Sequence, residues 1–140
     1  MRPPPELRAA FLGSSYGTAE RGMLRPGPGP APSWARGIWG IVTAWNPRGQ
    51  QASPEANAQQ QRDLAGILRG RPYRSGWNGE GEWCEPTFIV SGLSLGTLAC
   101  LGGTFGQAAV LYGSGRRAAL VWLEDAKVYA LERYFIVAEC

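Results

Sequence analysis

Glu85 is the residue whose type and setting in this sequence best fit proton chemistry. The two-residue period of a strand places Trp83, Glu85 and Thr87 on one face. A carboxyl beside Trp on an inner face is partly desolvated, which raises its pKa and suits a general base or acid. The same Glu would be structural if backbone amides, Asn46, Asn57 or an Arg supplied its hydrogen bonds. Both roles stay open, and the structural one is favoured because nothing else resembles a catalytic pair.

Amide side chains lie at the ends or on the inner faces of several predicted elements. Amides orient ligands or hold loops, and they rarely transfer protons. Buried polar groups must be paired, so their convergence near Glu85 would mark one polar site. The predicted ligand-binding residues are Thr43, Trp45, Asn46, Asn57, Gln61, Trp83 and Gln107.

A second candidate surface is the loop around residues 71–77, which contains Arg71, Tyr73, Arg74 and Trp77. Aromatic and basic side chains together suit stacking on nucleic-acid bases with phosphate contacts. A protein interface or a lid over the site explains the same composition. Residues 1–50 carry six Arg and two Glu, a net charge of +4, so the basic excess belongs to the leading segment. Nucleic-acid binding is therefore an alternative that we do not favour.

Composition excludes several kinds of chemistry. The chain of 140 residues has no His, which removes Ser-His-Asp and Cys-His catalysis and every His-containing metal site. Its three cysteines, Cys84, Cys100 and Cys140, are scattered and odd in number. We therefore expect no disulfide, metal or cofactor, and a reducing cytoplasm fits best. The uncharged stretch 86–115 is broken by glycines and hydroxyl residues, which favours a buried strand-helix-strand unit over a membrane span.

Hydrophobic period and turn residues predict an α+β fold, a single compact domain with a mixed central sheet and two main helices. A Pro/Gly-rich, partly ordered leading segment spans 1–37 and the globular domain spans 38–140. The predicted elements are helix 4–13, loop 26–33, strand 38–45, helix 53–69, loop 73–82, strand 88–91, helix 94–104, strand 108–112, a hairpin turn at 113–115 into strand 118–123, and strands 128–131 and 134–137.

Two local patterns position the polar residues. Ser53-Pro54-Glu55 begins the helix at 53–69, whose apolar stripe is Leu64, Ile67 and Leu68. At 100° per residue, Asn57 lies about 20° from Leu64 and faces the core, whereas Arg62 points outward. Pro86 cannot donate to a sheet, so its strand is predicted at an edge or bulged there.

The order of these motifs resembles a known family. The first motif consists of Thr43, Trp45, Asn46 and Pro47, and it is followed by Asn57 on a capped helix. The second motif consists of Glu85, Pro86 and Phe88, and the third of Phe105, Gly106 and Gln107. Together they resemble the small bacterial proteins catalogued as domain of unknown function 3293, over residues 38–123. The resemblance implies a bacterial, cytosolic, single-domain protein and carries no established activity.

The sequence therefore predicts a binding or accessory module that recognises a small polar ligand or a partner protein. Its site would lie around Asn46, Asn57, Glu85 and Gln107, and the partner could be a second copy of the chain. The main alternative is an enzyme with Glu85 as general base. The third hypothesis is a nucleic-acid-binding protein.

Overall fold

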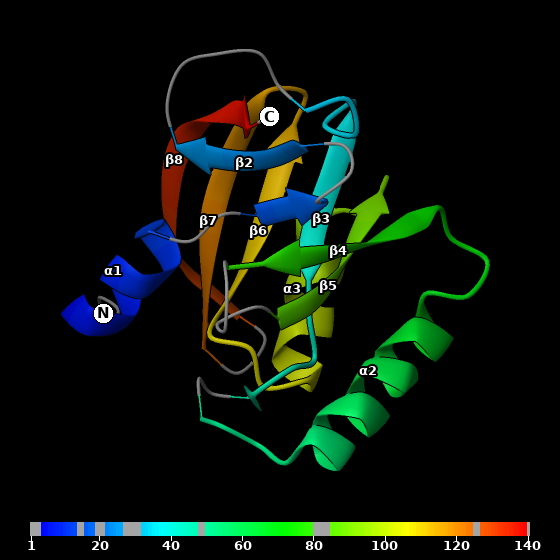
Figure 1. The fold of residues 1–140 in the computed structure, drawn as a ribbon. Coiled ribbons are helices and arrows are strands. Elements are labelled where there is room, and N and C mark those ends of the chain that lie inside the picture. Colours follow the sequence, from blue (N-terminus) through cyan, green and yellow to red (C-terminus); the bar gives the residue numbers. More distant parts are fainter. Residues whose placement is uncertain are drawn as a thin grey trace.

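The computed structural model describes residues 4–13, 16–18, 22–26, 32–47, 50–79, 85–124 and 127–139. Within them the chain forms three helices and eight strands (Figure 1). The elements are α1 (Pro5–Gly13), β1 (Tyr16–Thr18), β2 (Gly22–Pro26), β3 (Ile38–Val42), α2 (Pro54–Ile67), β4 (Tyr73–Asn78), β5 (Glu85–Ser91), α3 (Leu95–Thr104), β6 (Ala109–Ser114), β7 (Arg117–Glu124) and β8 (Lys127–Glu139). Trp83, Cys84, Cys140 and most of the predicted loop at 26–33 lie outside the described residues.

The strands form a closed barrel in the order β1-β2-β8-β7-β6-β3-β5-β4. This confirms the α+β class and the single domain. The sheet was predicted to be mixed, but every pairing described is antiparallel. Short connections such as the turn between β6 and β7 can join only antiparallel strands. The segment before residue 38 supplies β1 and β2, which bridge β4 and β8 at the front of Figure 1.

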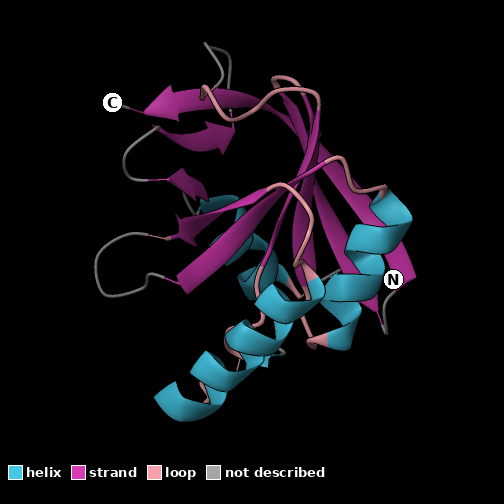
Figure 2. Ribbon diagram, turned by 90° about the vertical axis from the view of Figure 1, so that its right-hand side faces the viewer, coloured by secondary structure: helices cyan, strands magenta, loops and turns pink. Residues whose placement is uncertain are grey.

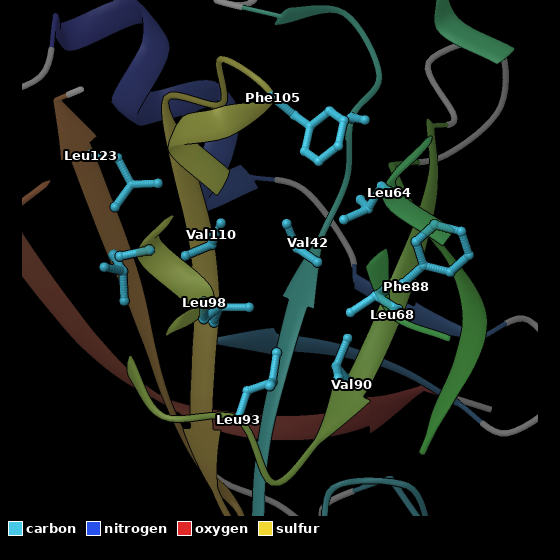
Figure 3. Packing of buried hydrophobic residues seen from close by; sticks show 13 residues of the cluster. Val42, Leu64, Leu68, Phe88, Val90, Leu93, Leu98, Phe105, Val110 and Leu123 are labelled. Carbon is cyan, nitrogen blue, oxygen red and sulfur yellow. The ribbon is translucent and has the colours of Figure 1, made fainter. Parts of the chain in front are cut away.

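Alternate residues of each strand supply two separate hydrophobic cores. The inner face of the barrel carries Ile41 and Ile89, together with Trp39, Leu111, Leu120 and Trp122. The outer face carries Val42, Phe88 and Val90, which pack with Leu64 and Leu68 of α2 and Leu98 of α3 (Figure 3). Figure 2 shows the strands curling around the inner core, with the helices gathered toward one half of the molecule. The protein is thus a barrel with a helical layer on part of its outside.

The two main helices begin where the sequence predicts. Ser53 and Ser94 occupy the N-caps of α2 and α3, and the Ser53 hydroxyl accepts a hydrogen bond from the backbone N–H of Ala56. Leu64 is buried, but Ile67, which we predicted in the same stripe, is 50% exposed. Three residues turn the helix by about 300°, which carries Ile67 off the contact line between α2 and the sheet.

Several predicted elements differ from the structure. The loop at 73–82 is wrong for residues 73–78, which form β4 and pair along their length with β5. Its glycine content suggested a loop, but Gly76 serves a close approach, because a Cβ there would lie 2.5 Å from the Gly17 carbonyl oxygen. The two terminal strands are one strand, β8, paired to β7 with a register shift at Trp122/Leu123. None of the described helices is long and apolar enough to cross a membrane.

Candidate functional site

The segment that follows β3 is fastened to α2 by two amide side chains. The backbone N–H of Asn46 donates to Asn57 Oδ1 at 2.8 Å, and Asn57 Nδ2 donates to Asn46 Oδ1, also at 2.8 Å. Asn46 Oδ1 also accepts from the Ala52 N–H at 3.0 Å. Asn46 has φ +46°, the one positive value outside glycine in the described residues, and Asn tolerates this conformation better than most residues. Asn57 is 3% exposed, as the helical geometry predicts, and we call this pair the Asn46–Asn57 latch.

Thr43 and Gln61 tie the end of β3 to α2 and to the start of β5. Gln61 Oε1 accepts from the Ala44 N–H at 2.9 Å, and Gln61 Nε2 donates to the Pro86 carbonyl at 3.1 Å. The Thr43 hydroxyl donates to the same carbonyl at 2.7 Å and accepts from the Trp45 N–H at 3.0 Å. Side chains therefore replace the backbone ladder around Pro86.

This arrangement corrects the prediction for the strand at Pro86. β5 is not an edge strand, because it pairs with both β3 and β4. However, the backbone pairing between β5 and β3 ends at Phe88. Pro86 lies beyond that point, so its missing N–H removes no hydrogen bond to β3. Proline is tolerated there for the same reason that it is tolerated on an edge.

Gln107 holds the loop from the other side. Its Nε2 donates to the Trp45 carbonyl at 3.2 Å and to the Phe105 carbonyl at 3.4 Å. The structure thus brings together the predicted residues Thr43, Trp45, Asn46, Asn57, Gln61 and Gln107. Trp45 takes part through its backbone, and Trp83 lies outside the described residues. The hydrogen bonds of these side chains run mostly to one another and to the backbone, so their role is to hold the loop.

Glu85 differs from these amides because its carboxyl group is not fully paired. Asn46 Nδ2 donates to Glu85 Oε1 at 3.3 Å, and it is the one donor found for this carboxyl in the described part of the chain. Burial raises the Glu85 pKa above its ordinary value, and the hydrogen bond from Asn46 opposes that rise. A structural Glu was expected to take its donors from backbone amides, Asn46, Asn57 or an Arg, and Asn46 is one of these. The bond is long and is the single one found in the described residues, so both the structural and the functional role of Glu85 stay open.

Three further polar side chains lie on the inner face of the barrel and were missed as site residues. Asn78 is paired in register with Glu85 across β4 and β5, Thr87 is two residues beyond Glu85, and Trp122 lies on β7. Within the described part of the chain, no hydrogen-bond partner is found for the buried atoms Asn78 Oδ1, Thr87 Oγ1 and Trp122 Nε1. Asn78 was missed because its segment was predicted as a loop. Thr87 had been placed on the Glu85 face, and its unsatisfied hydroxyl has no signature in the sequence.

The residues proposed for nucleic-acid binding do not share one face. Tyr73 and Trp77 alternate onto the outer side of β4 and are 40% and 46% exposed. Tyr73 packs edge-on against Phe88 with ring centroids 5.2 Å apart. Arg74 points to the opposite side of β4, and Arg71 precedes the strand.

Metal ligands do not gather in the described residues, where no group of three or more Cys, Asp and Glu side chains could hold an ion. Cys100 is a free cysteine exposed on α3.

The comparison with protein families bears directly on this region. Residues 42–110 match the family described as Protein of unknown function (DUF3293). This region of the chain is identified as a match to that family. No curated protein and no solved structure matches the chain. The match begins at the last residue of β3 and includes α2, Glu85 and Gln107, so the family region contains the latch and its surroundings. The predicted resemblance is confirmed over this range, which is shorter than the 38–123 expected, and the family carries no assigned activity.

Proposed function

We propose that this protein is a binding module that recognises a small polar ligand through Glu85. The observation that carries the proposal is the contrast between the amides and the carboxyl. Asn57, Gln61 and Gln107 spend their polar atoms on Asn46 and on the backbone, and Asn46 is held by Asn57 and Ala52 while its Nδ2 donates to Glu85. Glu85 receives one bond of 3.3 Å and is partly buried.

The latch supports this function by fixing the loop before a ligand arrives. A loop that is already ordered loses little conformational freedom on binding, so more of the contact energy contributes to affinity. Asn46 connects the two parts, because its Oδ1 is held by Asn57 and Ala52 while its Nδ2 donates to Glu85. The cysteine content and the family resemblance support a bacterial, cytoplasmic setting, which belongs to the same proposal.

A fragment screen by protein-observed NMR tests the proposal. We expect small polar fragments to shift the backbone amides of Glu85 and Asn46, and Glu85→Gln to abolish or weaken those shifts. Glu55→Gln is the matched control, because Glu55 is exposed in the first turn of α2. If fragments leave these amides unmoved, or bind Glu85→Gln equally well, the proposal is wrong. Slow tumbling of the free protein would instead point to a partner protein or a second copy.

The raised pKa of Glu85 favours one second candidate, an enzyme that uses this carboxyl as general base. A base works best when its pKa lies near the operating pH, and burial moves Glu85 in that direction. Titration of the Glu85 side-chain carboxyl by NMR decides this point. A midpoint close to neutrality would support proton transfer, whereas a midpoint in the ordinary carboxyl range would leave only the binding role.

A further inference from the structure

Three buried polar atoms on the inner face of the barrel have no hydrogen-bond partner among the residues that the structure describes: Thr87 Oγ1, Asn78 Oδ1 and Trp122 Nε1. Thr87 is 1% exposed and Trp122 is 0% exposed. Burying such a group without a hydrogen bond is costly, and folded proteins keep few of them. Three on one inner surface therefore indicate that a polar molecule supplies the missing bonds.

Strand register places two of these atoms beside Glu85. Asn78 lies directly opposite Glu85 on β4, and Gly76 lies opposite Thr87. A Cβ at Gly76 would stand 3.1 Å from Thr87 Oγ1 and 3.2 Å from Ile89 Cδ1, which puts Thr87 on the inner side with the barrel core. Asn78 is two residues from Gly76 and so faces the same way. Glu85, Thr87 and Asn78 thus form a polar inner wall across two neighbouring strands.

Trp122 lies at the same end of the barrel. Trp122 is near the end of β7. Its strand partners are Ala109 at the start of β6 and Ala130 near the start of β8. Because the strands are antiparallel, these strand ends lie at the same end of the barrel as the start of β5. Both partners are small residues, and Trp122 is fully buried between their strands. α1 covers this end, since the Phe11 ring meets Trp122 edge-on at 5.1 Å.

The two carboxylates at this end of the barrel, Glu132 and Glu85, differ in whether a cation lies beside them. Glu132 alternates onto the same inner face, opposite Leu120, but Arg8 of α1 donates to its carboxylate at 2.6 Å. In the described residues Glu85 has no such cation. Arg74 faces the inner side of β4, four residues from Asn78, and is exposed. The wall therefore presents a carboxyl with one long hydrogen bond and no cation beside it, and two oxygen acceptors without a partner in the described residues.

We propose that this inner wall binds a small organic cation, an ammonium, amidinium or guanidinium group. Its N–H groups donate to the Glu85 carboxylate, Asn78 Oδ1 and Thr87 Oγ1, and an acceptor atom elsewhere on the ligand receives the Trp122 indole N–H. A bond from a cation to a carboxylate is stronger than one between neutral groups, and an anion would be repelled by Glu85. This inference rests on the proposed ligand site at Glu85 and adds the ligand's charge and the residues that select it.

NMR titration of the full chain with two matched probes tests the charge. Methylguanidinium carries the expected cation, and N-methylurea has a similar shape without charge. We expect methylguanidinium to shift the Glu85 amide and the Asn78 side-chain amide, and N-methylurea to bind at least tenfold more weakly. Loss of a charged hydrogen-bond partner corresponds to about a ten- to hundredfold change in affinity, so Glu85→Gln should remove the preference for the cation.

Substitutions on the wall test the selecting residues. Thr87→Val keeps the shape, removes the hydroxyl and should weaken methylguanidinium several-fold, whereas Thr87→Ser should restore it. Thr104→Val is the control at an exposed helix end. Asn78→Asp keeps Oδ1, adds negative charge and should tighten the cation.

The outcomes separate this inference from the proposed function. Equal binding of the two probes, weaker cation binding by Asn78→Asp, or unchanged binding by Thr87→Val would overturn the cation wall. If other fragments still shifted the Glu85 amide in a Glu85-dependent manner, the ligand site itself would stand. If neither these probes nor any fragment acted at Glu85, both would fail.

Discussion

Replacing Asn57 by Ala tests whether the latch holds the loop that carries Asn46. Asn57 is 3% exposed on α2 and makes two side-chain bonds of 2.8 Å to Asn46, one as acceptor and one as donor. The substitution removes both bonds and leaves the Asn46 N–H without its partner. The loop would then lose its strongest connection to the helix.

The size of the effect follows from these contacts. Each bond contributes about 1 kcal/mol net, and a buried donor left unpaired costs a further 1–3 kcal/mol, roughly. If water partly reaches the freed N–H, the lower end applies, so we expect Asn57→Ala to lower the free energy of unfolding by about 3 kcal/mol. Gln59→Ala is the control on the same helix, because Gln59 is exposed and bonds only to Asp63 and Arg62. Its effect should stay within about 0.5 kcal/mol.

Urea unfolding of Asn57→Ala, Asn46→Gly and the double variant measures the latch as a coupling energy. Glycine adopts the positive φ of Asn46 without strain, so Asn46→Gly removes the amide while preserving the backbone. The two changes should be non-additive by about 1 kcal/mol or more, since both remove the same bonds. Additive effects, or a loss for Asn57→Ala no larger than that of Gln59→Ala, would show that the latch does not hold the loop.

Three further outcomes follow from the structure. Burial raises the pKa of Glu85 in the folded protein, so the protonated carboxyl favours the folded state. This contribution to the free energy of unfolding is fully present below the ordinary pKa of 4.5 and is lost as the pH rises through the folded-state pKa. Urea unfolding should therefore show Glu85→Gln at least as stable as wild type at pH 7, with the advantage gone at pH 4; a less stable variant at pH 7 would make Glu85 structural. Gly113→Ala should lower stability by about 1–3 kcal/mol in thermal melts, since a Cβ there meets the Trp39 indole, whereas Gly96→Ala, with open space on α3, should be neutral or stabilising. Single-stranded DNA should not bind at physiological salt; micromolar binding that weakens steeply with salt and is lost in Trp77→Ala would overturn this expectation.

The sequence predicted those parts of the site that depend on local rules. Helical angle placed Asn57 inward, strand period placed Glu85 and Thr87 on one face, and capping residues placed the start of α2. Each of these follows from geometry over a few residues. The convergence of the amides needed the register of β3 against β5, which no local rule supplies.

What the sequence could not show depends on long-range closure of the barrel. β4 looked like a loop because Gly76 is required by the approach of β1, a contact between segments about sixty residues apart. Missing β4 also hid Asn78, whose place opposite Glu85 exists only through that pairing. β1 closes the barrel beside Asn78, β2 connects β1 to the far end of β8, and α1 packs on Trp122 through Phe11.

Closure of the barrel also explains why Glu85 was first weighed as structural. Seen from one strand, a partly buried carboxyl must find donors, and amides were the expected source. In the fold Asn57 and Asn46 bond to each other beside α2, and Asn46 also donates to Glu85. Strand alternation places Glu85 on the same face of the sheet as Thr87 and Asn78. The same β5 residues therefore separate two functions: Pro86 anchors Thr43 and Gln61 through its carbonyl, and Glu85 turns inward with one hydrogen bond. A stable loop beside an unsatisfied inner wall is the arrangement that a preorganised ligand site requires.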